Sequence, residues 1–208
     1  MTIKAVFFDF DMTLVNSGSL AHASYEALLS YKHQVPSQKG FDAYIGRRVS
    51  ESLEQLASNN AEKKKLMNIF LKIHENKIKN LEVYGKEALK YIKAKKIKVI
   101  IISNNAKEVI KRTCKVHKLH YNLIIADEDM KLGEEKHQAI LRTLKKLGLK
   151  KDESFYVGDH INDIKEGKKA GVRVISVTTG VFSKNQLVKY RPFRIINNLN
   201  QIKDIIIC

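Results

Sequence analysis

Two carboxylates and a hydroxyl follow the first apolar segment of the chain: Asp9, Asp11 and Thr13 come directly after the run Ala-Val-Phe-Phe at 5–8. This short run of aromatic and aliphatic residues is typical of a strand that is buried on both faces of a parallel sheet. Two close carboxylates repel each other unless a cation or a raised pKa relieves the repulsion, so the pair suits an oxygen-seeking divalent ion such as magnesium. One carboxylate could then act as a nucleophile while the other transfers protons. An ordinary Asp-rich turn would explain the same residues, and this stretch alone leaves both interpretations open.

Polar side chains also follow two later apolar segments. Ser103 and Asn104 come at the end of the segment 98–102, where a hydroxyl and the backbone N–H groups of a turn can bind phosphate oxygens. Asp159 and Asp163 come after the segment 154–157, and their spacing of four places both carboxylates on one face of a helical turn. Helix capping would explain each cluster as well. Ligand sites of open α/β sheets lie at the carboxyl ends of the strands, which is where these residues are expected.

The segment 9–14, Asp-Phe-Asp-Met-Thr-Leu, resembles the DxDxT signature of the haloacid dehalogenase (HAD) superfamily, and 158–163 resembles its GDxxxD motif. The resemblance covers nearly the whole chain, with the family's motifs in the expected order. It implies a phosphatase in which Asp9 is the nucleophile and Asp11 the general acid/base. It also implies that Asp9, the backbone carbonyl of Asp11 and Asp159 bind Mg²⁺, with Asp163 supporting them.

The same resemblance assigns Ser103 to the transferring phosphoryl group, with Asn104 beside it, and we expect Thr13 to be substrate-binding as well. A basic residue must neutralise the charge that the carboxylates and the phosphate bring together. Phosphoglycolate phosphatase-like members carry this lysine in a Lys-Pro pair, which is absent here, so Lys131 and Lys136 are both candidates. We prefer Lys136, because a lysine in the first turn of a helix opposes the helix dipole unless an anion lies nearby.

Apolar periodicity divides the chain into two parts. Helical patterns cover 19–32, 49–57 and 62–79, and Pro36, Ser37 and Gly40 predict a break after the first of them. From Gly85 onward, helices (86–94, 106–117, 135–147, 162–170, 199–206) alternate with strands (98–103, 123–126, 154–157, 173–177, 193–196). The alternation predicts an α/β fold with a Rossmann-like parallel sheet. We expect a core domain of residues 1–15 and 82–208, with a small all-helical cap domain at 16–81 inserted after the first strand.

The composition limits what partners and location we expect. The chain of 208 residues has a net charge of +16, and 31 of its 38 basic residues are lysines spread over the predicted helices. We therefore expect solvated helix faces and no specific nucleic-acid site, although a positive field would attract a small phosphorylated metabolite. No apolar run reaches ~18 residues and the first strand starts too early for a signal peptide, so neither a membrane span nor export is expected. Cys114 and Cys208 form no metal or disulfide framework, and we expect a cytoplasmic monomer or homodimer.

The resemblance to the HAD superfamily therefore implies a phosphatase that acts on a small phosphate monoester, with phosphoglycolate as the leading substrate and an aspartyl phosphate as the intermediate. The basic pair Arg47–Arg48 follows Gly46 between two helices, and we expect it to bind the substrate, although solvated arginines explain it equally well. A β-phosphoglucomutase-like mutase is one alternative, but such mutases carry an arginine where this chain has Val49. A non-catalytic phosphate-binding regulatory protein is the alternative from another class, and the presence of every motif carboxylate disfavours it.

Overall fold

The computed structural model describes residues 2–206, so Cys208 lies outside the described residues. In that part of the chain, six parallel strands form one sheet in the order β3-β2-β1-β4-β5-β6. The strands are β1 (Ala5–Phe8), β2 (Lys98–Ile102), β3 (Leu123–Ile125), β4 (Ser154–Gly158), β5 (Arg173–Val177) and β6 (Arg194–Ile196). β1 pairs with β2 on one side and with β4 on the other, which confirms the parallel α/β core predicted from the sequence.

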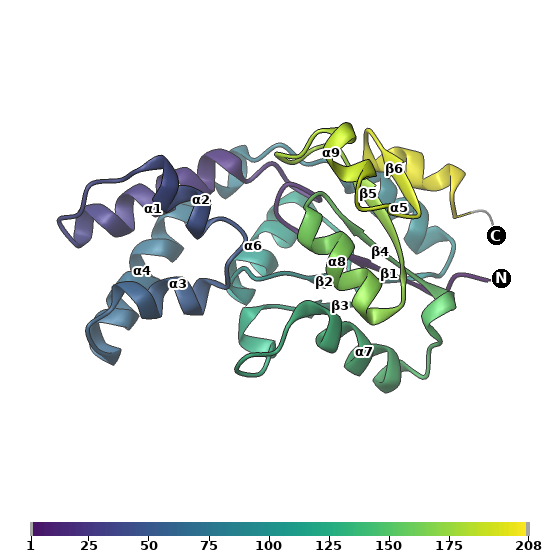
Figure 1. The fold of residues 1–208 in the computed structure, drawn as a ribbon, viewed down its shortest axis with the longest axis horizontal. Helices are drawn as coiled ribbons and strands as arrows, with labels where there is room; N and C mark the ends of the chain where they lie inside the picture. The colour runs from purple at the N-terminus through teal and green to yellow at the C-terminus, as the bar shows by residue number, and fades with distance from the viewer. Residues whose placement is uncertain (1, 207–208) are drawn as a thin grey trace.

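Helices cover both faces of this sheet (Figure 1). Val6 and Phe8 pack in one cluster with residues of α5 (Lys86–Ala94), α6 (Lys107–His117) and the 3₁₀-helix η4 (Leu199–Asp204). Ala5 and Phe7 pack in another cluster with α7 (Lys136–Leu147) and α8 (Ile161–Ala170). Successive strand residues therefore face opposite layers, and burial on both faces explains why the strands are apolar throughout. The shorter elements are α9 (Lys184–Val188) and the 3₁₀-helices η2 (Asp127–Asp129) and η3 (Lys151–Glu153).

The segment between β1 and β2 begins with the helical insert, which we define as residues 16–81. It contains α1 (Gly18–Tyr31), α2 (Gln38–Tyr44), α3 (Val49–Leu56), α4 (Asn60–Lys77) and the 3₁₀-helix η1 (Ile78–Asn80). Leu28, Leu53 and Phe70 form its apolar centre, which is continuous with Ala106 and Val109 at the start of α6. The insert therefore packs beside the sheet domain next to α6, as Figure 1 shows at the left of the view.

The predicted break after the first helix lies at 32–37, but the structure corrects the position of Gly40, because the unpredicted helix α2 begins directly after Ser37 and contains it. The Ser37 hydroxyl caps this helix by accepting a hydrogen bond from the Gly40 N–H at 3.1 Å. Gly40 fits because a Cβ there would lie 2.1 Å from the Tyr25 hydroxyl oxygen. The glycine is thus a close-packing residue within the helix and not a helix breaker. The last predicted helix is a 3₁₀-helix, and α9 was not predicted.

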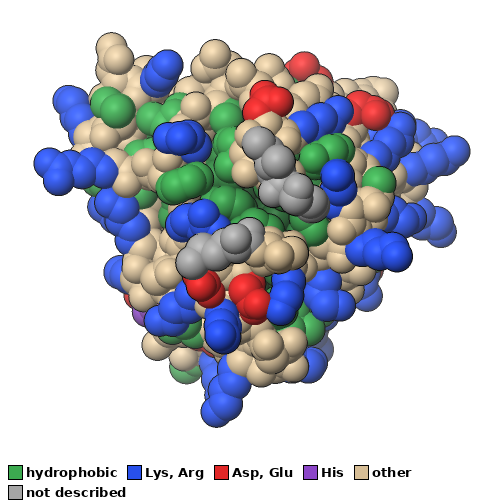
Figure 2. All heavy atoms as spheres, turned by 90° about the vertical axis from the view of Figure 1, so that its right-hand side faces the viewer, with side chains coloured by type: hydrophobic (Ala, Val, Ile, Leu, Met, Phe, Trp, Pro, Cys, Tyr) green, Lys and Arg blue, Asp and Glu red, His purple; other side chains and the backbone are tan. Residues whose placement is uncertain are grey.

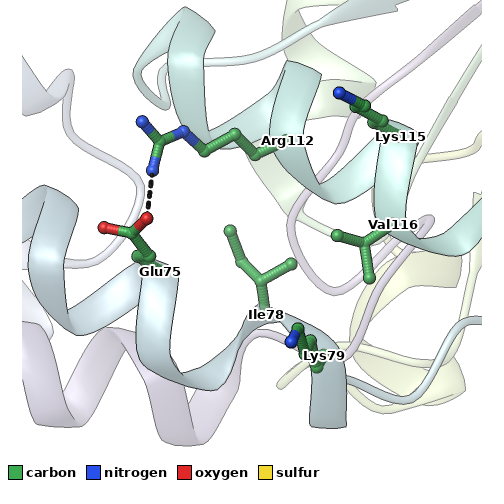
Figure 3. A pocket seen from close by; sticks show the side chains of 6 residues that line it. All are labelled: Glu75, Ile78, Lys79, Arg112, Lys115 and Val116. Carbon is green, nitrogen blue, oxygen red and sulfur yellow. Dashed lines mark ion pairs between the residues drawn. The ribbon is translucent and has the colours of Figure 1, made fainter.

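The end of the insert is tied to the core beside α6 (Figure 3). Glu75 of α4 forms a 3.0 Å ion pair with Arg112 of α6, and a ring nitrogen of His117 lies 2.7 Å from the Ile78 carbonyl oxygen. A surface groove of about 470 Å³ lies here, lined by Glu75, Ile78, Lys79, Arg112, Lys115 and Val116. The chain that returns from the insert to the core is therefore held against one helix of the core.

Lysine and arginine side chains are scattered around a central hydrophobic area on the face shown in Figure 2, with no single basic stripe. This dispersal agrees with a net charge of +16 carried mostly on helix surfaces. Among residues 2–206, no helix is both long enough and apolar enough to cross a membrane.

Candidate active site

The carboxyl ends of β1, β2 and β4 lie side by side because these strands are neighbours in the sheet. Asp9 follows β1, Ser103 follows β2, and Asp159 follows β4. The sheet order therefore gathers polar residues from three distant parts of the chain at one edge, where open α/β sheets bind ligands.

Asp9, Asp159 and Asp163 form a buried acidic cluster. One carboxylate oxygen from each lies within 4.8 Å of the other two, and the three residues are 7%, 5% and 2% exposed. Burial raises the pKa of Asp9 to about 7, although the Lys136 ammonium opposes this shift. Burial, followed by the charge of Asp9, raises the pKa of Asp159 well above its ordinary value. The cluster therefore holds more negative charge than its neighbours neutralise, a condition that a bound cation relieves.

Lys136 is the basic residue that reaches this cluster. Its Nζ lies 2.6 Å from Asp9 Oδ1 and 3.0 Å from Asp163 Oδ1. Burial disfavours the ammonium, but the charges of Asp163 and Asp9 raise its pKa well above the ordinary value. The buried Tyr156 hydroxyl donates to Asp163 Oδ1 at 2.6 Å and lies 3.2 Å from the Lys136 Nζ. Tyr156 therefore supports the ion pair between Lys136 and Asp163. Lys131, by contrast, is exposed and makes backbone hydrogen bonds with Glu134 and Arg48.

The Asp11 side chain faces the end of β2. The Asn105 amide donates to both of its carboxylate oxygens, at 3.2 and 3.1 Å, and the Ser103 hydroxyl lies 3.4 Å from Oδ2. The orientation of the Asn105 amide follows from its oxygen, which accepts a 2.8 Å hydrogen bond from the Ala106 N–H. Sequence reasoning chose Asn104 and missed Asn105. The sequence does contain a signal for Asn105, because it lies two residues after a serine, a spacing that allows a serine turn. In the structure the Asn105 N–H donates to the Ser103 hydroxyl at 3.0 Å.

The turn between Asp11 and Thr13 has a left-handed residue, Met12, with φ of 57°. The Met12 carbonyl accepts a hydrogen bond from the Thr179 hydroxyl at 2.5 Å, which holds this uncommon conformation in place. The Thr13 hydroxyl donates to Asp159 Oδ1 at 2.8 Å and is fully buried. Thr13 thus orients a carboxylate of the cluster, and its contact with substrate stays a prediction.

The remaining predicted residues, Asn104, Arg47 and Arg48, contact groups other than the three carboxylates of the acidic cluster. The Asn104 amide donates to the Gly46 carbonyl at 2.7 Å. The Arg47 guanidinium is hydrogen-bonded to the Gln55 amide oxygen, while Arg48 Nε lies 2.5 Å from Asp127 Oδ1. In this arrangement both arginines contact protein groups, so their role in substrate binding stays a prediction.

The donor set of the acidic cluster fits a divalent cation. Three carboxylates supply the hard oxygen ligands that Mg²⁺ and Ca²⁺ prefer. Gly180 passes close to the cluster, since a Cβ there would lie 1.9 Å from Asp159 Oδ2. The absence of a side chain at position 180 therefore leaves Asp159 in place, and a bound cation would oppose the burial that raises the pKa of Asp9 and of Asp159.

Comparison with known proteins agrees with this geometry. The family described as haloacid dehalogenase-like hydrolase matches residues 6–177, which is most of the chain. The chain therefore belongs to the haloacid dehalogenase-like hydrolases and is a hydrolytic enzyme of that family.

Particular relatives are similar over nearly the full length. A pyrophosphatase PpaX from Halalkalibacterium halodurans is 26% identical over 214 residues, covering 99% of this chain and 98% of that protein. Phosphoglycolate phosphatase 1 from Pseudomonas aeruginosa is 23% identical, covering 96% of this chain and 78% of that protein. The crystal structure of a predicted phosphoglycolate phosphatase from Haemophilus somnus superposes with a TM-score of 0.81 at 21% identity, covering 99% of this chain and 98% of that one. This last likeness concerns the fold.

Proposed function

We propose that the protein is a Mg²⁺-dependent phosphatase that hydrolyses a small phosphate monoester through an aspartyl phosphate on Asp9. The observation that carries the proposal is the separation of two carboxylates. Asp9 lies in the buried cluster beside Lys136, whereas Asp11 is held 3.1–3.2 Å from Asn105 on the other side of the turn. Two carboxylates in such different surroundings suit two different roles.

In the first step, an Asp9 oxygen attacks phosphorus and the bond from phosphorus to the oxygen of the leaving alcohol breaks. Asp11 donates its proton to the oxygen of the leaving alcohol. Asp11 then takes a proton from water, the water oxygen attacks phosphorus, and the Asp9–phosphorus bond breaks to release inorganic phosphate. Lys136 offsets the charge of Asp9 and of the phosphoryl oxygens throughout. A divalent cation held by Asp9, Asp159 and Asp163 would neutralise phosphate charge when bound.

The Asp9→Asn variant tests the nucleophile. The substitution is nearly isosteric, so the variant should fold, but the amide cannot accept the phosphoryl group and turnover should fall more than ~10³-fold. Phosphate release from p-nitrophenyl phosphate, measured with Mg²⁺ and again after treatment with EDTA, gives the readout. Asp11→Asn should cost on the order of 10²–10⁴. An Asp9→Asn enzyme that keeps more than a tenth of the wild-type rate would exclude the aspartyl phosphate.

Phosphoglycolate is our first choice of substrate, and inorganic pyrophosphate is the second because several relatives are named pyrophosphatases. We assign residues 16–81 the role of a cap over the site, with Arg47 available to contact the distal part of the substrate. A panel of phosphorylated metabolites that includes both compounds decides between them. Arg47→Ala should mainly raise KM for the true substrate and spare p-nitrophenyl phosphate, and equal losses on both would exclude a specificity role.

A β-phosphoglucomutase-like transfer reaction would appear in the same panel as isomerisation of a sugar phosphate without release of phosphate. A regulatory protein would bind phosphate and release none. We further propose a cytoplasmic monomer or homodimer without a specific nucleic-acid partner, which gel filtration and binding of labelled oligonucleotides can test.

A further inference from the structure

Asp127 is a residue of the core whose side chain is hydrogen-bonded to the helical insert. It follows β3 at the start of η2 and is only 2% exposed. Its carboxylate accepts three hydrogen bonds from the insert: Arg48 Nε at 2.5 Å, the Ser50 N–H at 2.6 Å and the Ser50 hydroxyl at 2.9 Å. A buried carboxylate is thus satisfied almost wholly by groups that belong to another part of the fold.

The rest of the Arg48 guanidinium is also bound to this corner of the core. Nη2 donates to the carbonyl oxygens of Asp127 and Met130 at 2.7 and 3.0 Å, and Nη1 donates to that of Lys131 at 2.9 Å. The Arg48 side chain is only 12% exposed. Such a fork of directed bonds fixes both the position and the direction of the loop that carries Arg48.

The other side of Asp127 leads to the candidate acid/base. The Asp127 N–H donates to the Asn105 carbonyl at 3.1 Å, and the Asn105 amide holds both oxygens of Asp11. The adjacent Asn104 carbonyl accepts the Val49 N–H at 3.0 Å. One short segment, 104–105, therefore contacts the insert, Asp127 and Asp11 together.

We propose that Asp127 is a positioning residue that latches the insert over the site and, through Asn105, holds Asp11 in its working orientation only while the latch is closed. The part concerning Asp11 rests on the proposed function, whereas the latch itself does not. A closed pair of this kind can open reversibly, because water would solvate both the Arg48 guanidinium and the Asp127 carboxylate once the insert moves away. The Glu75–Arg112 pair, which also joins the insert to the core, differs from the Arg48–Asp127 pair because its side chains are already exposed when the insert is closed.

The latch can be tested by amide hydrogen exchange in Asp127→Asn and Ser50→Ala. Both variants should speed exchange of the Val49 and Ser50 amides roughly 10- to 100-fold, the range of a typical coupling between two parts of a protein. Exchange in β1 should not change, which separates local opening from general loss of stability. Lys63→Ala is the matched control, because it removes a 2.6 Å ion pair with Glu54 that lies within the insert and does not reach the core.

The same variants test the link to Asp11 through kcat/KM for two substrates. Proton donation matters more for an alkyl phosphate than for p-nitrophenyl phosphate, whose leaving group departs without help. Asp127→Asn should therefore lower kcat/KM for the alkyl ester at least several-fold more than for the nitrophenyl ester, and Ser50→Ala should do so in the same direction.

Unchanged exchange at Val49 and Ser50 in both variants would overturn the latch, and so would an equal increase in Lys63→Ala. Equal losses on the two esters would overturn the link to Asp11. If Asp127→Asn does not fold, Ser50→Ala alone decides both points. A wild-type protein that releases no phosphate would remove the proposed function, while the exchange measurements would still decide the latch.

Discussion

At the scale of single residues, two of the three buried carboxylates contact one ammonium and the third does not. Asp9 and Asp163 both contact Lys136, while Asp159 is hydrogen-bonded to the Thr13 hydroxyl. An ordinary core would not keep such an excess of negative charge, because burial penalises each ion. We therefore infer that these carboxylates serve to bind a cation and that the surrounding fold keeps them together.

Lys136→Met should reduce turnover on the order of 10²- to 10³-fold, because it removes the charge 2.6 Å from the Asp9 carboxylate while keeping the length of the side chain. Lys131→Met should change turnover little, because the side chain of Lys131 is exposed. Steady-state rates with p-nitrophenyl phosphate measure both. The reverse pattern would show that Lys131, not Lys136, is the lysine that neutralises the charge of the site.

Gly180→Ala should weaken metal binding, because the new Cβ would lie 1.9 Å from Asp159 Oδ2 and the carboxylate would have to shift. We expect the Mg²⁺ concentration for half-maximal activity to rise about 10- to 100-fold, as when other supports of metal ligands are lost. Gly148→Ala is the control, since its φ of 65° also disfavours alanine but no atom lies within 4 Å. A similar Mg²⁺ dependence in the two variants would count against the role of Gly180.

At the scale of elements, Asp9, Ser103, Asp159 and Lys136 lie where a strand ends or a helix begins. β1, β2 and β4 deliver Asp9, Ser103 and Asp159, and α7 delivers Lys136 in its first turn. α4 of the insert contributes a different feature, His74, which is 4% exposed and whose ring Nδ1 lies 2.8 Å from the Phe70 carbonyl. That contact requires Nδ1 to donate, so the neutral ring carries its proton there.

Burial lowers the pKa of His74 below its ordinary 6.5. Because the folded-state pKa is depressed, the stabilising contribution of His74 is complete above pH 6.5 and is lost as pH falls through the folded value. The melting temperature of the wild type should therefore fall more between pH 7.5 and 5.5 than that of His74→Gln, measured in the same buffers. Parallel pH profiles for the two proteins would contradict this prediction.

At the scale of the whole molecule, the net charge of +16 surrounds a site built from acids. The local charges set the chemistry, while the wider positive field acts on an approaching phosphate dianion. The insert is also joined to the core at two separate places, through the ion pairs Arg48–Asp127 and Glu75–Arg112.

Raising the ionic strength from ~20 to ~200 mM should lower kcat/KM for p-nitrophenyl phosphate several-fold, because the Debye length falls from about 20 Å to about 7 Å. The value of kcat should stay nearly constant, since the bound complex no longer depends on long-range attraction. Initial rates over a range of KCl and substrate concentrations give both constants. A kcat/KM that does not respond to salt would mean that the dispersed lysines do not attract the substrate.

The sequence by itself determined the sheet, the order of its motifs and the identity of the acids. Strands buried on both faces must be apolar, and residues 5–8 satisfy this requirement without any knowledge of their partners. The turn residues that follow each strand are also local, which is why Asp9, Asp11, Ser103, Asp159 and Asp163 could be found. The short helix α2 could not, because Gly40 is explained only by its contact with Tyr25.

Only the tertiary structure decided which neighbours these residues meet. Lys136 and Asp9 are 127 positions apart, and Arg48 and Asp127 are 79 positions apart. Asn104 and Asn105 are adjacent in sequence, yet one amide points to the insert and the other to Asp11. Local patterns cannot predict such choices, because each depends on where a distant segment places its own hydrogen-bonding groups and on which of them are buried.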